Sequence, residues 1–525
     1  MGSGRRPAGA GPPAGSRVER VSTVQNSEQD APSGRLVGLD DSFARELPEL
    51  CMDFVADSVE APATLVLNDD LAQRLGMDPV WLGSPQGTEV LVGNRVPEGA
   101  HPVAMAYAGH QFGNYSPRLG DGRAVLLGEL LDGDSERRDL HLKGSGRTPF
   151  ARGGDGKASI GPMLREYVVS EAMAALGIPT TRSLAVVSTG ESVMRETPEP
   201  GAVLVRVAAS HIRVGTFEYA VRLGGDELVR RLADYSIARH HPEAASATNP
   251  YLAFLGAVIE AQAGLVAQWM LVGFIHGVMN TDNMTISGEG IDYGPCAFMD
   301  RYDPATVFSS IDHGGRYAYG NQPAVAAWNL ARLAETLLGL IATDPDEAIE
   351  LATAELAEFQ SRFQQHWSNG LARKLGLESP PSDGSLFEDL LSTMQADRLD
   401  WTGTFRELAR TLRVEATDDD GSGEAPAAHS EAMRQWIGRW RAELEAQGRP
   451  VGSTAEGMDE VNPLYIPRNH LVDDALSDAT GGTLAGFEEL VRVLKDPYHR
   501  RDGCDGFTTP APEGFEDTFR TFCGT

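Results

Sequence analysis

The sequence is poor in lysine and cysteine. Only four of its 45 basic residues are lysines, at positions 143, 157, 374 and 495. Where a bare positive charge would serve, the chain nearly always uses Arg, so a lysine inside a motif is informative. Four cysteines in 525 residues, at positions 51, 296, 504 and 523, are too few for the disulfide framework of a secreted protein. We therefore expect a reducing, cytoplasmic location.

Positive charge and long apolar runs are also scarce. The formal net charge is −30, whereas a general nucleic-acid-binding protein needs a basic surface to displace counterions. Residues 261–281 carry no formal charge, but Gln262, Gln268 and His276 interrupt that stretch, which favours a buried core helix over a membrane span. We expect neither nucleic-acid nor membrane partners.

Residues 1–35 are rich in Gly, Pro, Ala, Ser and Arg and contain no apolar run. This composition predicts a disordered leader rather than a signal peptide or an anchor.

Short β-type runs fill the first part of the remaining chain. They are bounded by Gly, Pro and Asp and lie at residues 63–67, 89–92, 103–107, 123–131, 139–143, 183–187 and 203–208. One helix is predicted among them, at 162–176. After residue 226 the pattern is helical, at 227–237, 252–278, 326–341 and 346–367. The order indicates an α+β fold of protein-kinase type with two lobes: a β-rich, nucleotide-binding N-lobe (36–225) and a helical C-lobe (226–525).

The C-lobe contains a sequence like a kinase catalytic loop. HGVMNTDN spans residues 276–283, and the triplet DYG follows at 292–294. A kinase places its catalytic Asp two residues after the His and a metal-binding Asn five residues later. Asn283 stands in the Asn register, but Val278 stands where the Asp should be. The pattern predicts a site for a metal-bound nucleoside triphosphate that lacks the usual kinase base.

Lys143 ends a β run and leads into Gly144-Ser145-Gly146, the position of a kinase phosphate-binding lysine. A plain surface lysine is the alternative. Glu166, on the following predicted helix, is its natural ion-pair partner. Glu171 on the same helix is the alternative, and spacing alone does not decide between them.

Two glycine-rich loops and two arginines complete the nucleotide candidates. LGDGR (119–123) would let backbone approach phosphates, although an ordinary hairpin turn has the same composition. RGGDGK (152–157) is the second loop. Arg206 and Arg213 flank the end of the last β run, and converging arginines could clamp a triphosphate. For DYG a plain turn is the alternative, yet an Asp shortly after an Asn fits a cation that bridges phosphates.

Several long motifs, in this order, resemble those of the selenoprotein O family of protein adenylyltransferases. They are YAGHQFG (107–113), LGDGR (119–123), LKGSGRTP (142–149), SEAM with LGIPTTR (170–173 and 176–182) and HGVMNTDN (276–283). The likeness covers residue 36 to the C-terminus. It implies a pseudokinase-like fold that binds ATP in a flipped orientation, so that AMP is transferred to Ser, Thr or Tyr hydroxyls of other proteins.

The resemblance also implies roles for individual residues. Asp282 would be the proton acceptor, while Asn283 and Asp292 would hold Mg²⁺ or Mn²⁺. The nucleotide contacts would come from the residues that match the family's motifs: Gly120, Gly122, Arg123, Lys143, Asp155, Gly156, Arg206, Arg213 and Asp292. Family members carry a cysteine or selenocysteine near the C-terminus, which makes Cys523 the redox candidate; a pairing with Cys296 is left open.

Two other functions are compatible with the residues. One is an atypical protein or small-molecule kinase that uses Asp282 as its base with ATP in the normal orientation. The other is a catalytically silent pseudokinase scaffold that binds ATP to hold its shape. The missing base at Val278 favours the scaffold, whereas Lys143, Asn283 and Asp292 favour retained metal-ATP chemistry.

Overall fold

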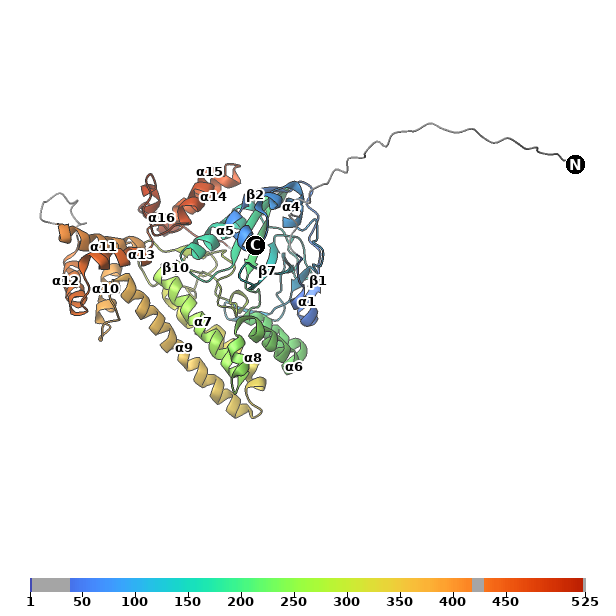
Figure 1. The fold of residues 1–525 in the computed structure, drawn as a ribbon, viewed down its shortest axis with the longest axis horizontal. Coiled ribbons are helices and arrows are strands. Elements are labelled where there is room, and N and C mark those ends of the chain that lie inside the picture. Colours follow the sequence, from blue (N-terminus) through green and yellow to red (C-terminus); the bar gives the residue numbers. More distant parts are fainter. Residues whose placement is uncertain (2–37, 418–428, 523–525) are drawn as a thin grey trace, which may run out of the picture.

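A computed structural model describes residues 38–417 and 429–522, together with Met1. Apart from Met1, the predicted leader at 1–35 lies outside these residues, as does the redox candidate Cys523. Within them the chain forms a large antiparallel sheet and many helices (Figure 1). This mixed composition agrees with the α+β prediction.

The main sheet has seven strands in the order β1-β3-β6-β7-β9-β8-β2, and every pairing is antiparallel. Its strands are β1 (Cys51–Asp53), β2 (Ala63–Leu67), β3 (Val103–Met105), β6 (Ala124–Leu131), β7 (Arg137–Lys143), β8 (Arg182–Met194) and β9 (Pro198–Ala208). Two small hairpins stand apart from it: β4 (Gly109–Gln111) with β5 (Asn114–Ser116), and β10 (Phe274–Ile275) with β11 (Ala297–Phe298).

Helices cover both faces of the main sheet. Leu140 and Leu142 of β7 pack with α2 (Asp69–Arg74), α3 (Pro79–Leu82) and α4 (Pro85–Leu91) in one core cluster. The opposite face packs against α5 (Ile160–Ala175), which α14 (Asn469–Thr480) and α15 (Ala485–Leu494) cover in turn. Since successive side chains of a strand point to opposite faces, Lys143 faces the α5 side.

Most of the described chain from α6 onward is helical. In Figure 1 the long green and yellow helices run below the sheet, and the orange ones lie at the left. They are α6 (Val214–His240), α7 (Pro250–Leu271), α8 (Gln322–Ile341), α9 (Pro345–Lys374), α10 (Ser385–Ala396), α11 (Trp401–Thr417), α12 (Glu431–Ala446) and α13 (Val451–Val461). Short helices α1 (Ser42–Glu46) and α16 (Phe515–Thr518) lie near the two ends.

Two predicted elements are wrong. The strand expected at 89–92 is part of α4, because Ser84 caps the helix through Gly87 N and Pro85 occupies its first turn. The helix expected at 252–278 ends at Leu271, because Gly273 adopts a φ of 76° and the chain continues into β10.

Within the described residues, two helical stretches are long and apolar enough to cross a membrane, Pro250–Leu271 and Tyr319–Ile341. By length and composition alone this is weak evidence, since core helices pass the same test. In α7, Ala263, Val266 and Ala267 are completely buried against other parts of the fold. This agrees with the buried core helix predicted from the sequence.

Candidate functional site

Four charged groups meet between the sheet and α5. Lys143 Nζ lies 2.7 Å from Glu166 Oε2 and 2.6 Å from Asp292 Oδ1. Arg206 of β9 also donates to both carboxylates. Because the register pairs His141 with Arg206 across β7 and β9, the arginine reaches the same face as Lys143. Glu171, the alternative partner for Lys143, is bound instead by Arg182 at 2.6 Å.

The cluster is electrostatically balanced, with two cations facing two carboxylates. Burial by itself would raise the pKa of Glu166, but the charges of Arg206 and Lys143 outweigh it and hold the pKa below the usual value. The same two cations, with Arg213, hold the pKa of Asp292 well below its usual value despite burial. Both acids are therefore ionised at neutral pH, and an arriving polyphosphate would compete with them for Lys143 and Arg206.

The catalytic-loop residues lie in the helical part, beside β10. His276 is bonded through Nε2 to Ile291 O at 2.8 Å, which ties the loop to the segment that carries Asp292. Val278, in the kinase base position, is 5% exposed. Thr281–Asn283 form one turn of 3₁₀-helix, and this turn places the Asp282 carboxylate next to Gly109 of β4.

Asp282 has the properties of a proton acceptor. Its side chain is buried, and burial raises its pKa to about 6 against the opposing charge of Arg213. Oδ2 accepts a bond from Gln111 Nε2 at 3.3 Å, while Oδ1 has no hydrogen-bond partner in the described part of the chain. A carboxylate with one free oxygen and a raised pKa is suited to take a proton from a hydroxyl.

Asn283 and Asp292 offer oxygen ligands of the kind that Mg²⁺ and Mn²⁺ prefer. Asn283 donates its amide Nδ2 to Val278 O at 3.1 Å, so its Oδ1 is the atom available to a cation. Lys143 and Arg206 both donate to Oδ1 of Asp292. No cluster of three or more His, Cys, Asp or Glu that could hold a metal occurs in the described part of the chain. A cation here would thus need phosphate oxygens and water as further ligands, which is how Mg²⁺ is commonly held in nucleotide sites.

Arg213 is a buried cation with N–H donors that lack an acceptor among the described residues. Its guanidinium stacks 4.2 Å from the centre of the Tyr107 ring and lies 3.6 Å from Asp121 Oδ1. Nε and Nη1 are buried and make no hydrogen bond to any described residue. Unmet donors on a buried arginine are costly, and a phosphate oxygen would satisfy them.

The first glycine-rich loop is tightly packed. Gly120 has a φ of 74°, and a Cβ there would lie 2.3 Å from the Phe150 ring. At Gly122 a Cβ would lie 3.1 Å from Phe150 O. Arg123 O accepts bonds from the backbone N–H of Gly144 and Ser145, so this loop is fastened to the turn after Lys143. Burial lowers the pKa of Arg123, whereas the negative charges of Asp292 and Glu166 raise it. The Arg123 guanidinium therefore interacts electrostatically with the charge cluster.

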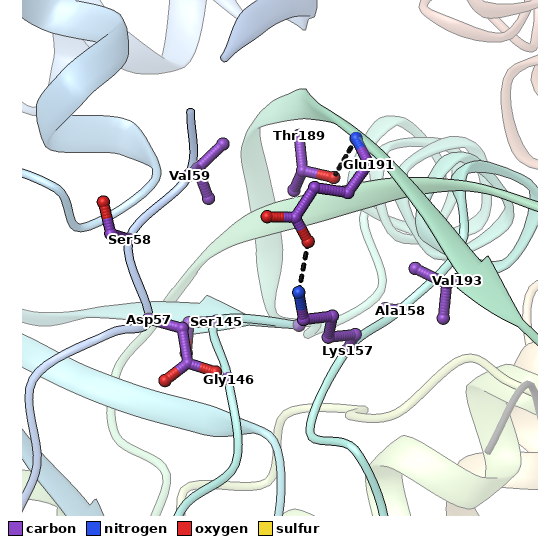
Figure 2. A pocket seen from close by; sticks show the side chains of 11 residues that line it. Asp57, Ser58, Val59, Ser145, Gly146, Lys157, Ala158, Thr189, Glu191 and Val193 are labelled. Carbon is purple, nitrogen blue, oxygen red and sulfur yellow. Dashed lines mark hydrogen bonds and ion pairs between the residues drawn. The ribbon is translucent and has the colours of Figure 1, made fainter. Parts of the chain in front are cut away.

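The second loop lies at the outer side of the same turn. Gly156 has a φ of 73°, and a Cβ there would meet Gly146 O at 2.0 Å. Asp155 is partly exposed and pairs with Arg195 at 2.8 Å instead of with the Lys143 cluster. Figure 2 shows the adjoining pocket, where Lys157 pairs with Glu191 across the turn. The pocket has room for about one water, with a volume of about 10 Å³, and as it stands it is too small for a nucleoside.

Four residues near the site were given no role from sequence. Gln111 and Gly109 contact Asp282, and both stand in the YAGHQFG motif. Asp121 lies beside Arg213 and accepts a bond from His141 Nε2 at 3.0 Å. Strand alternation was the available signal for His141, because a residue two positions before Lys143 shares its face of the sheet.

Comparison with known proteins gives matches over nearly the whole chain. The family model described as "Protein adenylyltransferase SelO" matches residues 41–495. A relative named "Protein nucleotidyltransferase YdiU" from Mycolicibacterium smegmatis is 60% identical over 500 residues, covering 94% of this chain and 99% of the relative. A relative of the same name from Rhodococcus jostii is 56% identical over 520 residues, covering 98% of this chain and 100% of the relative.

Proposed function

The chain belongs to the protein adenylyltransferase SelO family, and we propose from this membership that it transfers AMP from ATP to Ser, Thr or Tyr hydroxyls of other proteins. Two observations carry the proposal together. Val278 stands where a kinase has its catalytic Asp, and the buried Asp282 keeps one carboxylate oxygen, Oδ1, without a hydrogen bond to the described residues. A site with this arrangement retains a base but moves it away from the kinase position.

At the α-phosphorus one bond forms and one breaks, and one proton moves. The acceptor hydroxyl oxygen bonds to the α-phosphorus of ATP, the bond from that phosphorus to the bridging oxygen breaks, and pyrophosphate leaves. The hydroxyl proton goes to Asp282 Oδ1. Lys143, Arg206 and Arg213 neutralise the phosphates, and the unmet donors of Arg213 support a role in holding the released end. Asn283 and Asp292 would hold Mg²⁺ or Mn²⁺, which supplies charge neutralisation on the triphosphate when bound.

The finer architecture belongs to the same proposal. The sheet with α5 would form a nucleotide-binding N-lobe (36–225), and the chain from the second half of α6 onward would form a helical C-lobe (226–525), as in a protein kinase. The sparse cysteines support a cytoplasmic location.

The test is which phosphate moves. With ATP labelled at the α- or the γ-phosphate, we expect α-label on protein, release of pyrophosphate, and an added AMP by mass spectrometry. Asp282→Asn should lower transfer about 100-fold or more, because a base acts in the transition state, while ATP affinity measured by calorimetry stays within about threefold. Asp473→Asn, an exposed residue of α14, is the matched control and should transfer at the wild-type rate.

The other possible results indicate a different function. Label from γ-phosphate without α-label would establish an atypical kinase. Binding of ATP with neither label on protein, in Mg²⁺ and in Mn²⁺, would establish a pseudokinase scaffold.

A further inference from the structure

The β4–β5 hairpin lies directly over the catalytic loop. His110 N donates to Thr281 Oγ1 at 2.7 Å, and Phe112 N donates to Asn280 Oδ1 at 3.1 Å. Between them Gln111 contacts Asp282 itself. The hairpin turn, which ends at Gly113, therefore stands beside the position that an acceptor hydroxyl must reach.

An arginine surface adjoins this turn. The guanidinium of Arg316 lies 3.8 Å from where a Cβ on Gly113 would be, and it stacks 4.9 Å from the centre of the Trp328 ring on α8. Arg332, one helical turn further along α8, stacks 4.8 Å from the same ring. Tyr317, next to Arg316, donates its hydroxyl to Asn280 at 2.5 Å. We call Arg316, Trp328 and Arg332 the arginine surface.

The charge of Arg316 is not neutralised within the fold. Among the described residues Arg316 forms no ion pair, and its Nε is buried without a hydrogen-bond partner. The nearby carboxylate of Asp312 is occupied by the backbone N–H of Arg316 and of Tyr317. Arg332 contacts Glu335 at 2.7 Å, but the Glu335 side chain is 58% exposed, so that pair is weak.

This local positive charge contrasts with the whole chain, whose formal net charge is −30. A guanidinium stacked on an aromatic face keeps its N–H edges free to bind a carboxylate in bidentate fashion. The surface is also within reach: Gln111, which contacts Asp282, and Gly113, which adjoins Arg316, are two residues apart in one hairpin turn, a separation of at most roughly 7 Å. An acidic side chain two or three residues from an acceptor hydroxyl at Asp282 spans a similar distance.

We propose that the arginine surface binds the acceptor segment of the substrate protein and selects segments with Asp or Glu two or three residues from the modified hydroxyl. The proposal rests on the proposed function, because it assigns the acceptor class for the same site.

The experiment uses the full-length protein, α-labelled ATP and synthetic peptides that differ only in the residues around one Ser, Thr or Tyr. The flanking residues are Glu, Gln or Lys. We expect kcat/KM for the Glu peptides to exceed that for the Lys peptides by about tenfold or more, with Gln between them. The preference should weaken as salt is raised, because the pairing is partly exposed.

Arg316→Glu should reverse the order of Glu and Lys peptides and leave the Kd for ATP unchanged. The control is Arg439→Glu on α12, an arginine with a 52% exposed side chain that pairs with Asp389; it should keep the wild-type order. Arg316→Gln serves as the milder variant if Arg316→Glu unfolds, and it should flatten the preference.

The outcomes separate the two proposals. Equal use of Glu and Lys peptides by the wild-type protein overturns the acceptor preference while the adenylyltransferase stands. So does α-label on intact proteins with none on any peptide, because the preference would then not be read from a local segment. Absence of α-label on every peptide and protein overturns the proposed function, and the acceptor preference falls with it.

Discussion

Gly109 is a position where an added side chain would directly disturb the proposed base, Asp282. A Cβ at this position would lie 2.5 Å from Asp282 Oδ1 and 2.8 Å from Leu119 Cδ1. Both atoms are ends of side chains that can move, so we expect Gly109→Ala to fold with little loss of stability but to displace the carboxylate. A misplacement of about 1 Å can lower the rate about 100-fold.

Steady-state transfer of α-label and calorimetry with ATP measure this prediction. We expect kcat to fall by at least about tenfold with ATP affinity retained, whereas Gly438→Ala, where an added Cβ meets no atom within 4 Å, should keep the wild-type rate. Normal kcat in Gly109→Ala would show that the carboxylate position is not critical.

For single residues, the sequence predicted which side chains belong to the candidate site better than it predicted their contacts. Motif register pointed to Lys143 and Asp292, but left Glu166 and Glu171 open. The two glutamates are five residues apart on α5, roughly 140° around the helix at about 100° per residue, so they face different neighbours. Which face turns to Lys143 is decided by packing against the sheet, and that information is spread over the whole core. The contact of Gly109 with Asp282 joins residues far apart in the chain and has no local signal.

Among the elements, α6 shows how one glycine sets a boundary. The sequence predicted a helix from residue 227, and the structure begins α6 at Val214 and interrupts it at Gly225, where φ is 59° and ψ is −154°. The predicted start was right for the second half because Gly224-Gly225-Asp226 does break the helix. The first half was missed, since its cap at Arg213 is not a residue type that usually caps helices.

Replacement of Gly225 tests this interruption. Its backbone lies in a region that is essentially restricted to glycine, and an added Cβ would meet no atom within 4 Å, so backbone strain is the only expected effect. Gly225→Ala should lower the free energy of unfolding by about 1–3 kcal/mol, measured by urea denaturation. Gly438→Ala, inside α12 with ordinary helical φ, should instead raise it by about 0.5–1 kcal/mol. A stabilising Gly225→Ala would mean that the two halves of α6 can join as one helix without strain.

For the whole molecule, the pattern of apolar residues along the sequence predicted a mixed fold and the buried helix α7. It could not predict which charges would be buried. Lys374, one of only four lysines, ends α9 and is 5% exposed, with its Nζ 4.1 Å from the centre of the Phe405 ring. Burial lowers its pKa to about 7, whereas an unfolded lysine has a pKa of about 10.4.

This shift makes the stability of the whole chain depend on pH. Between pH of about 7 and about 10.4 the unfolded chain binds a proton at Lys374 that the folded chain has lost, so this residue makes the free energy of unfolding rise with pH, by up to about 1.4 kcal/mol per pH unit. Below pH 7 both states are protonated, so the cost of burying the charge is felt in full. We expect Lys374→Met to be more stable than the wild-type protein at pH 6, by at least about 2 kcal/mol, with the difference shrinking toward pH 9. Urea denaturation at both pH values measures this, and Lys495→Met, which removes an exposed pair with Asp70, should change stability by less than about 1 kcal/mol at either pH. A difference between Lys374→Met and wild type that stays constant from pH 6 to pH 9 would mean that Lys374 keeps its proton throughout, and that the fold accommodates a buried ammonium without lowering its pKa.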